Sequence, residues 1–225
     1  NSAFKNELMN YDANYQNEQA VSPYFERHLD SVAGIVERSM GKELIIEVGC
    51  GKAFFLEMLQ ERGFDILGFD PTYEGTNPQI KRSYFDSNVK MRAKGLILRH
   101  VLEHIQNPFS FLQSIRDANG GDGKIYIEVP CLDWILEHKA WYDIFYEHVN
   151  YFRLSDLQNM FSSVHECGRI FGGQYIYVVA DISSLTKPKI DSADPLCFPD
   201  DFAYSIAGAH KKRLSKSVVW GGASK

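Results

Sequence analysis

Side chains able to do acid–base chemistry are concentrated in one short stretch, YEHVNYF, at residues 146–152. It holds Tyr146, Glu147 and His148, with further aromatic residues on either side. A phenol, a carboxylate and an imidazole are groups that donate, accept and relay protons, and an imidazole titrates near neutral pH. The same residue types would also suit a solvated loop, a metal site, or a packed amphipathic helix whose Glu and His satisfy buried partners.

A second group of candidate residues surrounds a glycine turn in IIEVGCGKAFF, residues 45–55. The apolar run before the turn predicts a buried strand with Glu47 near its end, and Gly49 and Gly51 lead into a helix. Asp70 ends the next expected strand. Ligands of open α/β sheets bind at the carboxyl ends of strands, so we expect a ligand site here. The alternative is a tight turn in which the glycines only avoid steric clashes and no ligand binds.

The spacing of this turn distinguishes between cofactors. A dinucleotide site needs a third glycine where Phe54 stands, and no Gly-Lys-Ser/Thr follows at the spacing of a phosphate-binding loop. S-adenosylmethionine (SAM) carries no phosphate. It needs close backbone approach and acceptors for its ammonium group and ribose hydroxyls. Glu47 beside the glycines and Asp70 at the second strand suit those needs, so SAM is the expected cofactor.

Alternating strands and helices must position these residues. The alternation predicts an α/β fold with right-handed β-α-β units: a Rossmann-like, doubly wound, mostly parallel sheet with an antiparallel edge strand at 174–182. The other strands are expected at 44–48, 65–70, 81–85, 95–100 and 124–130. Helices are expected from Ser22 to Gly41, at 53–62, from Asn107, at 153–164 and at 201–214; Pro follows both Ser22 and Asn107.

Composition limits the classes of function. The net charge is −5 and no basic stripe occurs in the 225 residues, so no nucleic-acid partner is expected. No apolar run approaches the roughly 18 residues that a membrane span needs, so no membrane association is expected. The four cysteines are widely separated and form no C-x-x-C pair. This argues against a zinc knuckle and indicates reduced thiols in a cytoplasmic protein.

Three segments in order, EVGCG, GFDP and LILRHVLEHI, resemble motifs of the class I SAM-dependent methyltransferases. The resemblance covers about residues 22–182 and implies the fold and the cofactor of that superfamily. Ala53 replaces a glycine that many members carry. The resemblance also implies an aromatic pair near the adenine and a basic pair near the methionyl part. The implied cofactor residues are Glu47, Gly49, Gly51, Asp70, Tyr84, Phe85, Arg99 and His100.

An alternative interpretation of Glu103 and His104, in the motif LILRHVLEHI, is that they are metal ligands. No His-Glu-x-x-His spacing occurs in the chain, and this motif usually forms a structural turn. No metal site is therefore expected from the sequence.

The segment EVP…FYEHVNYF resembles a narrower family, the C-methyltransferases of nucleotide-linked keto-sugars, in which a Y-H-E-H-like motif precedes a Tyr-Phe pair. Gly172 and Gly173 match paired glycines that precede a strand in that family, and Tyr15 lies in a lead-in that closes on the site there. VVWGGASK resembles the opening of the family's third domain. The implied organisation is a lead-in at 1–21, a SAM-dependent methyltransferase domain at 22–185, and at 186–225 a linker, a helix and the start of a truncated C-terminal α/β domain.

The narrower resemblance implies a reaction on a small molecule, either a nucleotide-linked sugar or a related surface-glycan precursor. His148 would be the general base that removes the proton beside a ketone, with Glu147 to orient it or to act itself, and Tyr146 would donate to the enolate oxygen. Phe145 stands where the family has the first Tyr of that motif, and the 225 residues contain no counterpart of the family's N-terminal cysteine-rich zinc module. The alternatives are O-methylation of another small metabolite, with His148 taking a hydroxyl proton, and a SAM-fold binding protein without turnover.

Overall fold

A seven-stranded mixed sheet forms the centre of the fold in the computed structural model, which describes residues 22–144, 146–189 and 191–211. The strand order is β3-β2-β1-β4-β5-β7-β6; the first five strands of the chain are parallel, and β7 and β6 complete the sheet in antiparallel pairing. The order reverses between β1 and β4, which is where open α/β sheets bind ligands. The strands are β1 (Ile45–Val48), β2 (Ile66–Phe69), β3 (Ile80–Lys81), β4 (Gly95–Arg99), β5 (Lys124–Pro130), β6 (Val164–Ile170) and β7 (Tyr175–Asp181).

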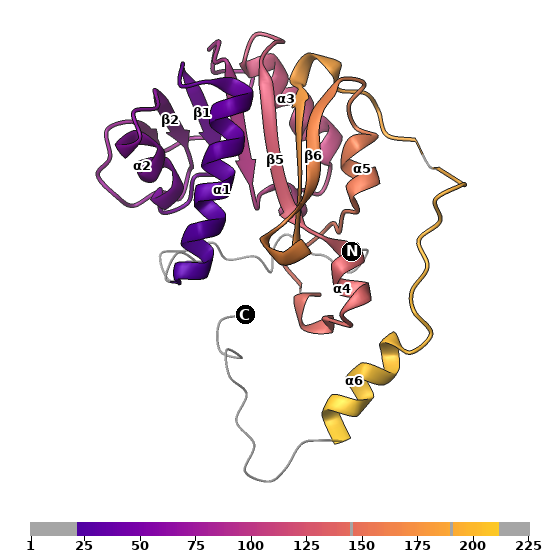
Figure 1. Ribbon diagram of the computed structural model, residues 1–225. Helices are drawn as coiled ribbons and strands as arrows, with labels where there is room; N and C mark the ends of the chain where they lie inside the picture. Colours follow the sequence, from indigo (N-terminus) through magenta and orange to yellow (C-terminus); the bar gives the residue numbers. More distant parts are fainter. Residues whose placement is uncertain (1–21, 145, 190, 212–225) are drawn as a thin grey trace.

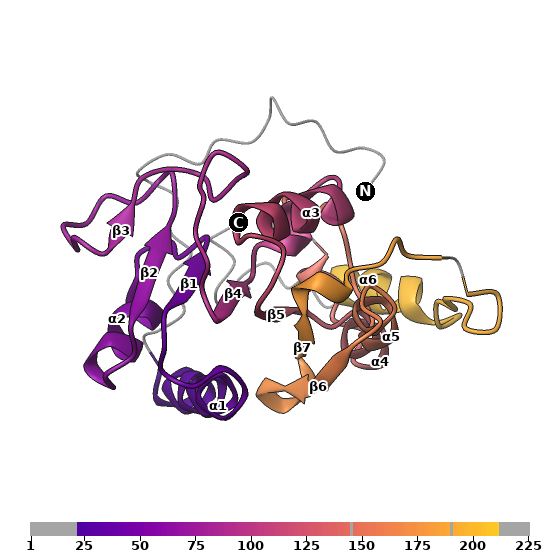
Figure 2. The ribbon, with the colours of Figure 1, turned by 90° about the horizontal axis from the view of Figure 1, so that it is seen from above.

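Helices cover both faces of the sheet and give the fold three layers (Figures 1 and 2). Helices α1 and α2 lie on one face and α3 on the other. In Figure 1, α4 and α6 lie below the sheet, beyond the end at which β5 finishes. The helices are α1 (Pro23–Met40), α2 (Phe54–Glu61), α3 (Pro108–Ala118), α4 (Leu132–Glu137), α5 (Leu154–Gln158) and α6 (Phe202–Lys211), and the 3₁₀ turns are η2 (Leu102–His104), η3 (Trp141–Asp143), η4 (Phe171–Gly173) and η5 (Ile182–Ser184).

Each face of the sheet buries its own apolar core, because parallel strands covered on both faces are apolar on both sides. Successive residues of β1 point to opposite faces, so Ile45 packs with Val36 of α1 and Leu59 of α2, whereas Ile46 packs in the core that contains Leu112 of α3. All five of these side chains are fully buried. The two cores fix the strands, and therefore the loops at the carboxyl ends of the strands.

Capping residues in the sequence set the starts of the two best-predicted helices. The side chain of Ser22 accepts a hydrogen bond from the backbone N–H of Phe25 at 3.1 Å, and Asn107 accepts one from Ser110 at 3.1 Å. In both helices a proline follows the cap, as predicted, and Gly41, with φ of 74°, caps the C-terminus of α1.

Both edges of the sheet differ from the sequence prediction. The strand predicted at 81–85 is wrong, because β3 pairs with β2 over only two residues, Ile80 and Lys81. The helix predicted at 153–164 ends at Gln158, and the strand β6 that follows was not predicted. Consequently β7 is antiparallel, as expected, but it is not the edge strand.

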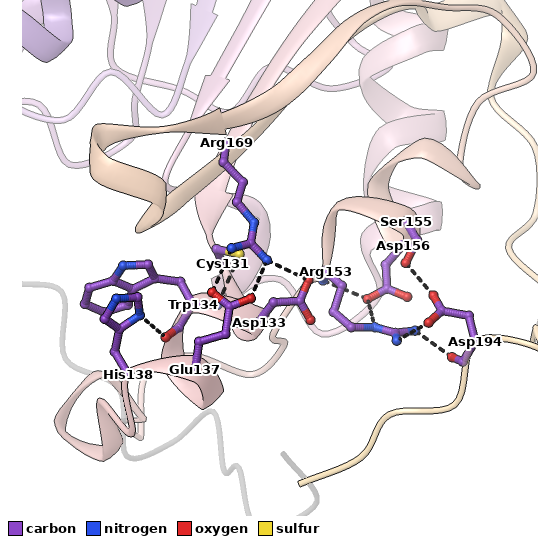
Figure 3. A network of polar contacts seen from close by, with 10 residues as sticks. All are labelled: Cys131, Asp133, Trp134, Glu137, His138, Arg153, Ser155, Asp156, Arg169 and Asp194. Carbon is purple, nitrogen blue, oxygen red and sulfur yellow. Dashed lines mark hydrogen bonds and ion pairs between the residues drawn. The ribbon is translucent and has the colours of Figure 1, made fainter. Parts of the chain in front are cut away.

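A polar network on the β6 side holds the segments that follow β5 and β7 in place (Figure 3). Arg169 of β6 contacts two carboxylates of α4, Glu137 at 2.8 and 2.9 Å and Asp133 at 3.5 Å. Arg153 donates to Asp194 at 2.8 Å and so ties the start of α5 to the segment after β7. Ion pairs that solvent reaches, as it reaches these, each contribute about 1 kcal/mol or less, so their main effect is on orientation.

Within the described residues, no helix combines the length and the apolar character that crossing a membrane requires. All four cysteines are free thiols.

Candidate active site

The glycine turn after β1 contains three residues in the left-handed region: Gly49 with φ of 74°, Gly51 with φ of 54° and Ala53 with φ of 71°. The two glycines are required for different reasons. A Cβ on Gly49 would lie 2.5 Å from Cγ2 of Val101, so this glycine serves packing inside the protein. A Cβ on Gly51 would meet nothing within 4 Å, so this glycine borders open space at the switch point of the sheet.

Asp70, at the end of β2, joins the two loops on this side of the switch point. Its Oδ2 accepts a hydrogen bond from the backbone N–H of Gly51 at 2.8 Å. Its Oδ1 accepts from the backbone N–H of Thr72 at 2.8 Å and from the Thr72 hydroxyl at 2.7 Å. Each carboxylate oxygen has two lone pairs, so acceptor capacity remains for a ribose hydroxyl.

Glu47 places a buried carboxylate beside the same turn. Its side chain is 3% exposed, and Oε2 has no hydrogen-bond partner among the described residues. Burial raises the pKa of this carboxyl to about 8, with the charge of Arg99 opposing the shift and that of Asp70 adding to it. Buried polar atoms in proteins nearly always have a partner, so this oxygen is suited to a donor from a ligand, such as an ammonium group.

At the end of β4, Arg99 and His100 are anchored on the carboxylate of Glu128 in β5, which is fully buried. Arg99 donates to Oε1 at 3.2 Å, Nε2 of His100 lies 3.1 Å from it, and His28 of α1 also contacts it at 3.1 Å. The Tyr126 hydroxyl donates to Oε2 at 2.6 Å. Burial opposes ionisation, but the charge of Arg99 and the two imidazoles hold the pKa of Glu128 well below its usual range.

Tyr84 and Phe85 were predicted to end a strand and to lie near the adenine, but both lie outside β3. Tyr84 is 70% exposed, whereas Phe85 is buried and packs edge-to-face on Phe69, with ring centroids 4.9 Å apart. Tyr15 lies outside the described residues, so its predicted position over the site stays a prediction.

The stretch at 146–152 is not a helix; it is a turn followed by extended chain, and it is fixed to η2. The backbone N–H groups of Val149 and Asn150 both donate to the carbonyl of Glu103, at 2.9 and 3.0 Å. Nδ1 of His104 lies 3.1 Å from the carbonyl oxygen of Glu147. The structure therefore places Glu103 and His104, from the motif LILRHVLEHI, against residues 146–152.

These contacts place three of the chemistry-bearing side chains together. The ring of His148 is buried and meets that of His104 edge-to-face, with centroids 5.0 Å apart. The buried carboxylate of Glu103 joins them: one ligand-capable atom from each of the three lies within 4.8 Å of the others. Tyr146 is 39% exposed and Glu147 is half-buried, while Phe145 lies outside the described residues.

The comparison with protein families matches residues 15–164 to a family described as a methyltransferase domain. The chain belongs to this methyltransferase-domain family. A curated relative, the C-methyltransferase NovU of Streptomyces niveus, is 25% identical over 134 residues, and the match covers 54% of this chain and 32% of the relative. The match therefore spans about a third of that relative's length.

Solved structures show the same class I, Rossmann-like methyltransferase fold. The 1,6-didemethyltoxoflavin-N1-methyltransferase of Burkholderia thailandensis, solved with 1,6-didemethyltoxoflavin and S-adenosylhomocysteine (SAH), has a TM-score of 0.51 at 14% identity and covers 69% of this chain and 78% of its own. The magnesium protoporphyrin IX methyltransferase of Synechocystis PCC 6803, with bound SAH, has a TM-score of 0.52 at 14% identity, covering 70% and 82%. At this identity the likeness concerns the fold.

Two residues of the site in this methyltransferase domain, Glu128 and His104, were not predicted from the sequence. Glu128 lies in an apolar strand, where a carboxylate is a signal in itself, because buried acids are rare unless they are paired. His104 was interpreted as part of a structural turn; it does lie in η2, and it also contacts His148. No local pattern connects residues 104 and 148, and only the tertiary fold does so.

Proposed function

We propose that this methyltransferase domain transfers the methyl group of SAM to a small molecule, a nucleotide-linked sugar or a related surface-glycan precursor. The cofactor part of the proposal is carried by one observation: the buried Oε2 of Glu47, which has no hydrogen-bond partner among the described residues, beside the open side of Gly51 at the switch point of a methyltransferase fold. The C-methyltransferase relative supports carbon as the methyl acceptor. We place the reaction in the cytoplasm, consistent with four free thiols.

The residues at the switch point fit the cofactor. When bound, SAM supplies an electrophilic methyl group on a sulfonium centre. In the proposal Glu47 accepts hydrogen bonds from the ammonium group, Asp70 accepts them from the ribose hydroxyls, and Gly51 permits close backbone approach. The proposal also counts Gly49, Tyr84, Phe85, Arg99, His100 and Tyr15 among the residues of the cofactor site.

On the acceptor side His148 is the proposed general base. Its ring is buried, so bulk water does not compete for the proton that it removes from the carbon beside a ketone. Tyr146, which is 39% exposed, is the proposed donor to the developing oxyanion. Glu147 holds the neighbouring His104 through its backbone carbonyl, and its half-buried carboxylate is the proposed partner of the base.

O-methylation is the second candidate. Phe145 replaces a tyrosine of the sugar C-methyltransferases, and the phenol at that position is therefore missing. In this version His148 deprotonates a hydroxyl, and the rest of the site keeps its roles. We further propose that residues 22–185 form the methyltransferase domain and that 186–225 are a linker, a helix and the start of a C-terminal α/β domain.

The test is methyl transfer from isotope-labelled SAM to a panel of deoxy-keto sugar nucleotides, with NMR to locate the methyl group on carbon or oxygen. Replacing His148 with Ala should lower turnover by about a hundredfold or more while SAH still binds. His165→Ala, a change at an exposed histidine of β6, is the matched control and should leave turnover unchanged. Unchanged turnover of His148→Ala would rule out the base, and absence of transfer to every sugar nucleotide would rule out the acceptor class.

A further inference from the structure

We infer that a divalent first-row transition-metal cation binds to the side chains of Glu103, His104 and His148. One ligand-capable atom from each residue lies within 4.8 Å of the other two. Two imidazoles and one carboxylate form a donor set that suits such cations, and three protein ligands leave a coordination position open. The inference goes beyond the proposed function, because none of the roles proposed there requires a cation.

Glu103 supplies a carboxylate that the protein itself only partly satisfies. Its side chain is 2% exposed, and Oε1 lies 3.4 Å from Nδ1 of His100. The other oxygen, Oε2, is buried and has no hydrogen-bond partner in the part of the chain that the structure describes. An ionised carboxylate is costly to bury without a donor or a cation. A cation held between Glu103 and the two imidazoles would supply that partner.

His104 is held in the tautomer that metal-binding histidines adopt. Its Nδ1 lies 3.1 Å from the carbonyl oxygen of Glu147, and a carbonyl can only accept, so Nδ1 carries the proton. In the neutral ring Nε2 then carries the lone pair. Histidine ligands commonly donate their other N–H to a backbone carbonyl, which fixes the ring and strengthens the ligand.

The backbone around the three ligands is already in place. Glu103 and His104 are adjacent in η2, and the segment that carries His148 is fixed to η2 by the hydrogen bonds from Val149 and Asn150 to the Glu103 carbonyl. Ligands at about 2.1 Å around a tetrahedral ion lie about 3.4 Å apart. The three atoms would need to draw together by no more than about 1.4 Å from their 4.8 Å limit, which side-chain rotation can supply.

A bound cation would change what His148 can do. A nitrogen lone pair that binds a cation cannot accept a proton, so cation binding and the proposed base role exclude each other at any one moment. Binding is best measured without SAM or any acceptor. Failure of this inference would then leave the proposed methyl transfer untouched, and failure of methyl transfer would leave the cation site standing.

The first test is calorimetric titration of the chelator-treated chain with Zn²⁺ and with Mn²⁺. We expect one saturable site for Zn²⁺ with a Kd in the micromolar range. Glu103→Gln and His104→Asn should each weaken it by about 100-fold or more. His165→Asn, which removes an exposed histidine paired with Asp181, is the control for surface binding and should leave the Kd unchanged.

The second test keeps the inference falsifiable even if the variants fail to fold. X-ray absorption of the wild-type chain with one equivalent of Zn²⁺ should show two imidazole ligands and further oxygen ligands, with no sulfur. Sulfur ligands would place the ion at a cysteine such as the exposed Cys197 and would overturn the inference. Absence of saturable binding, or a Kd that is the same in all the variants, would overturn it as well.

Discussion

Replacing Glu47 with Gln should weaken cofactor binding and stabilise the folded chain at the same time. Glu47 is buried, and its Oε2 has no partner among the described residues. In the proposal this oxygen accepts from the ammonium group of the cofactor. A hydrogen bond to a charged group contributes about 1.5–3 kcal/mol. At about 1.4 kcal/mol per tenfold change, SAH should bind about 10- to 150-fold more weakly to Glu47→Gln.

The effect on stability has the opposite sign and depends on pH. The folded-state pKa of Glu47 is about 8, raised by burial from an ordinary value of 4.5. At pH values between 4.5 and about 8, the carboxyl of Glu47 keeps its proton in the folded chain and loses it in the unfolded chain. The stability linked to this proton is therefore fully present below about pH 4.5 and is lost as the pH rises toward 8. A glutamine does not titrate, so the stability of Glu47→Gln should lack this loss. By pH 8.5 the loss in wild type should be on the order of 3–5 kcal/mol.

The assay is urea denaturation at pH 5.5 and 8.5, combined with calorimetric titration of SAH at pH 7.5, for wild type and Glu47→Gln. Glu61→Gln, at an exposed position of α2, is the control and should change neither quantity. Binding of SAH to Glu47→Gln within twofold of wild type would refute the role of Glu47 in the site. A stability difference that does not grow with pH would refute the reasoning from burial.

Three further predictions concern the glycine turn, the buried carboxylate and the core. Gly51→Ala and Gly63→Ala both place a Cβ in open space at positive φ and should each cost about 1–2 kcal/mol of stability, but only Gly51→Ala should weaken SAH binding by calorimetry. Glu128→Ala removes the fully buried carboxylate that pairs with Arg99, whose side chain is only 9% exposed, and should lower the free energy of unfolding by about 3–5 kcal/mol, whereas the exposed Glu137→Ala should change it by about 1 kcal/mol or less. Leu112→Ala opens a cavity in a fully buried position and should cost about 2–5 kcal/mol in the same urea experiment.

The parts of the fold that depend on local chemistry could be predicted from the sequence. The caps at Ser22 and Asn107 and the glycine turn at residues 49–51 act over a few residues, and each is found in its expected place. The edges of the sheet could not be predicted. Strand β6 is half exposed along its length and carries His165, Glu166 and Arg169, so it lacks a clean alternation. Its pairing with β7 is what makes it a strand.

In the candidate site, too, some residues could be predicted from the sequence and others could not. The glycines and Asp70 belong to motifs with a readable spacing, and the structure joins them through the hydrogen bond from Gly51 to Asp70. The contact of His28 with Glu128 joins residues 100 positions apart, and it depends on α1 packing over β5. Tertiary packing likewise brings His104 to His148. Long-range polar clusters of this kind have no sequence period from which they could be predicted.

The most direct test of the central claim, that the switch point of this methyltransferase domain binds SAM, is thermal denaturation of the wild-type chain with SAH and, separately, with NAD. SAH at about 100 times its Kd should raise the free energy of unfolding by about 2.7 kcal/mol, because it binds only the folded state. NAD should produce no shift, since Phe54 occupies the place of the third glycine of a dinucleotide turn. A melting temperature unchanged by SAH, or raised equally by NAD, would contradict the claim.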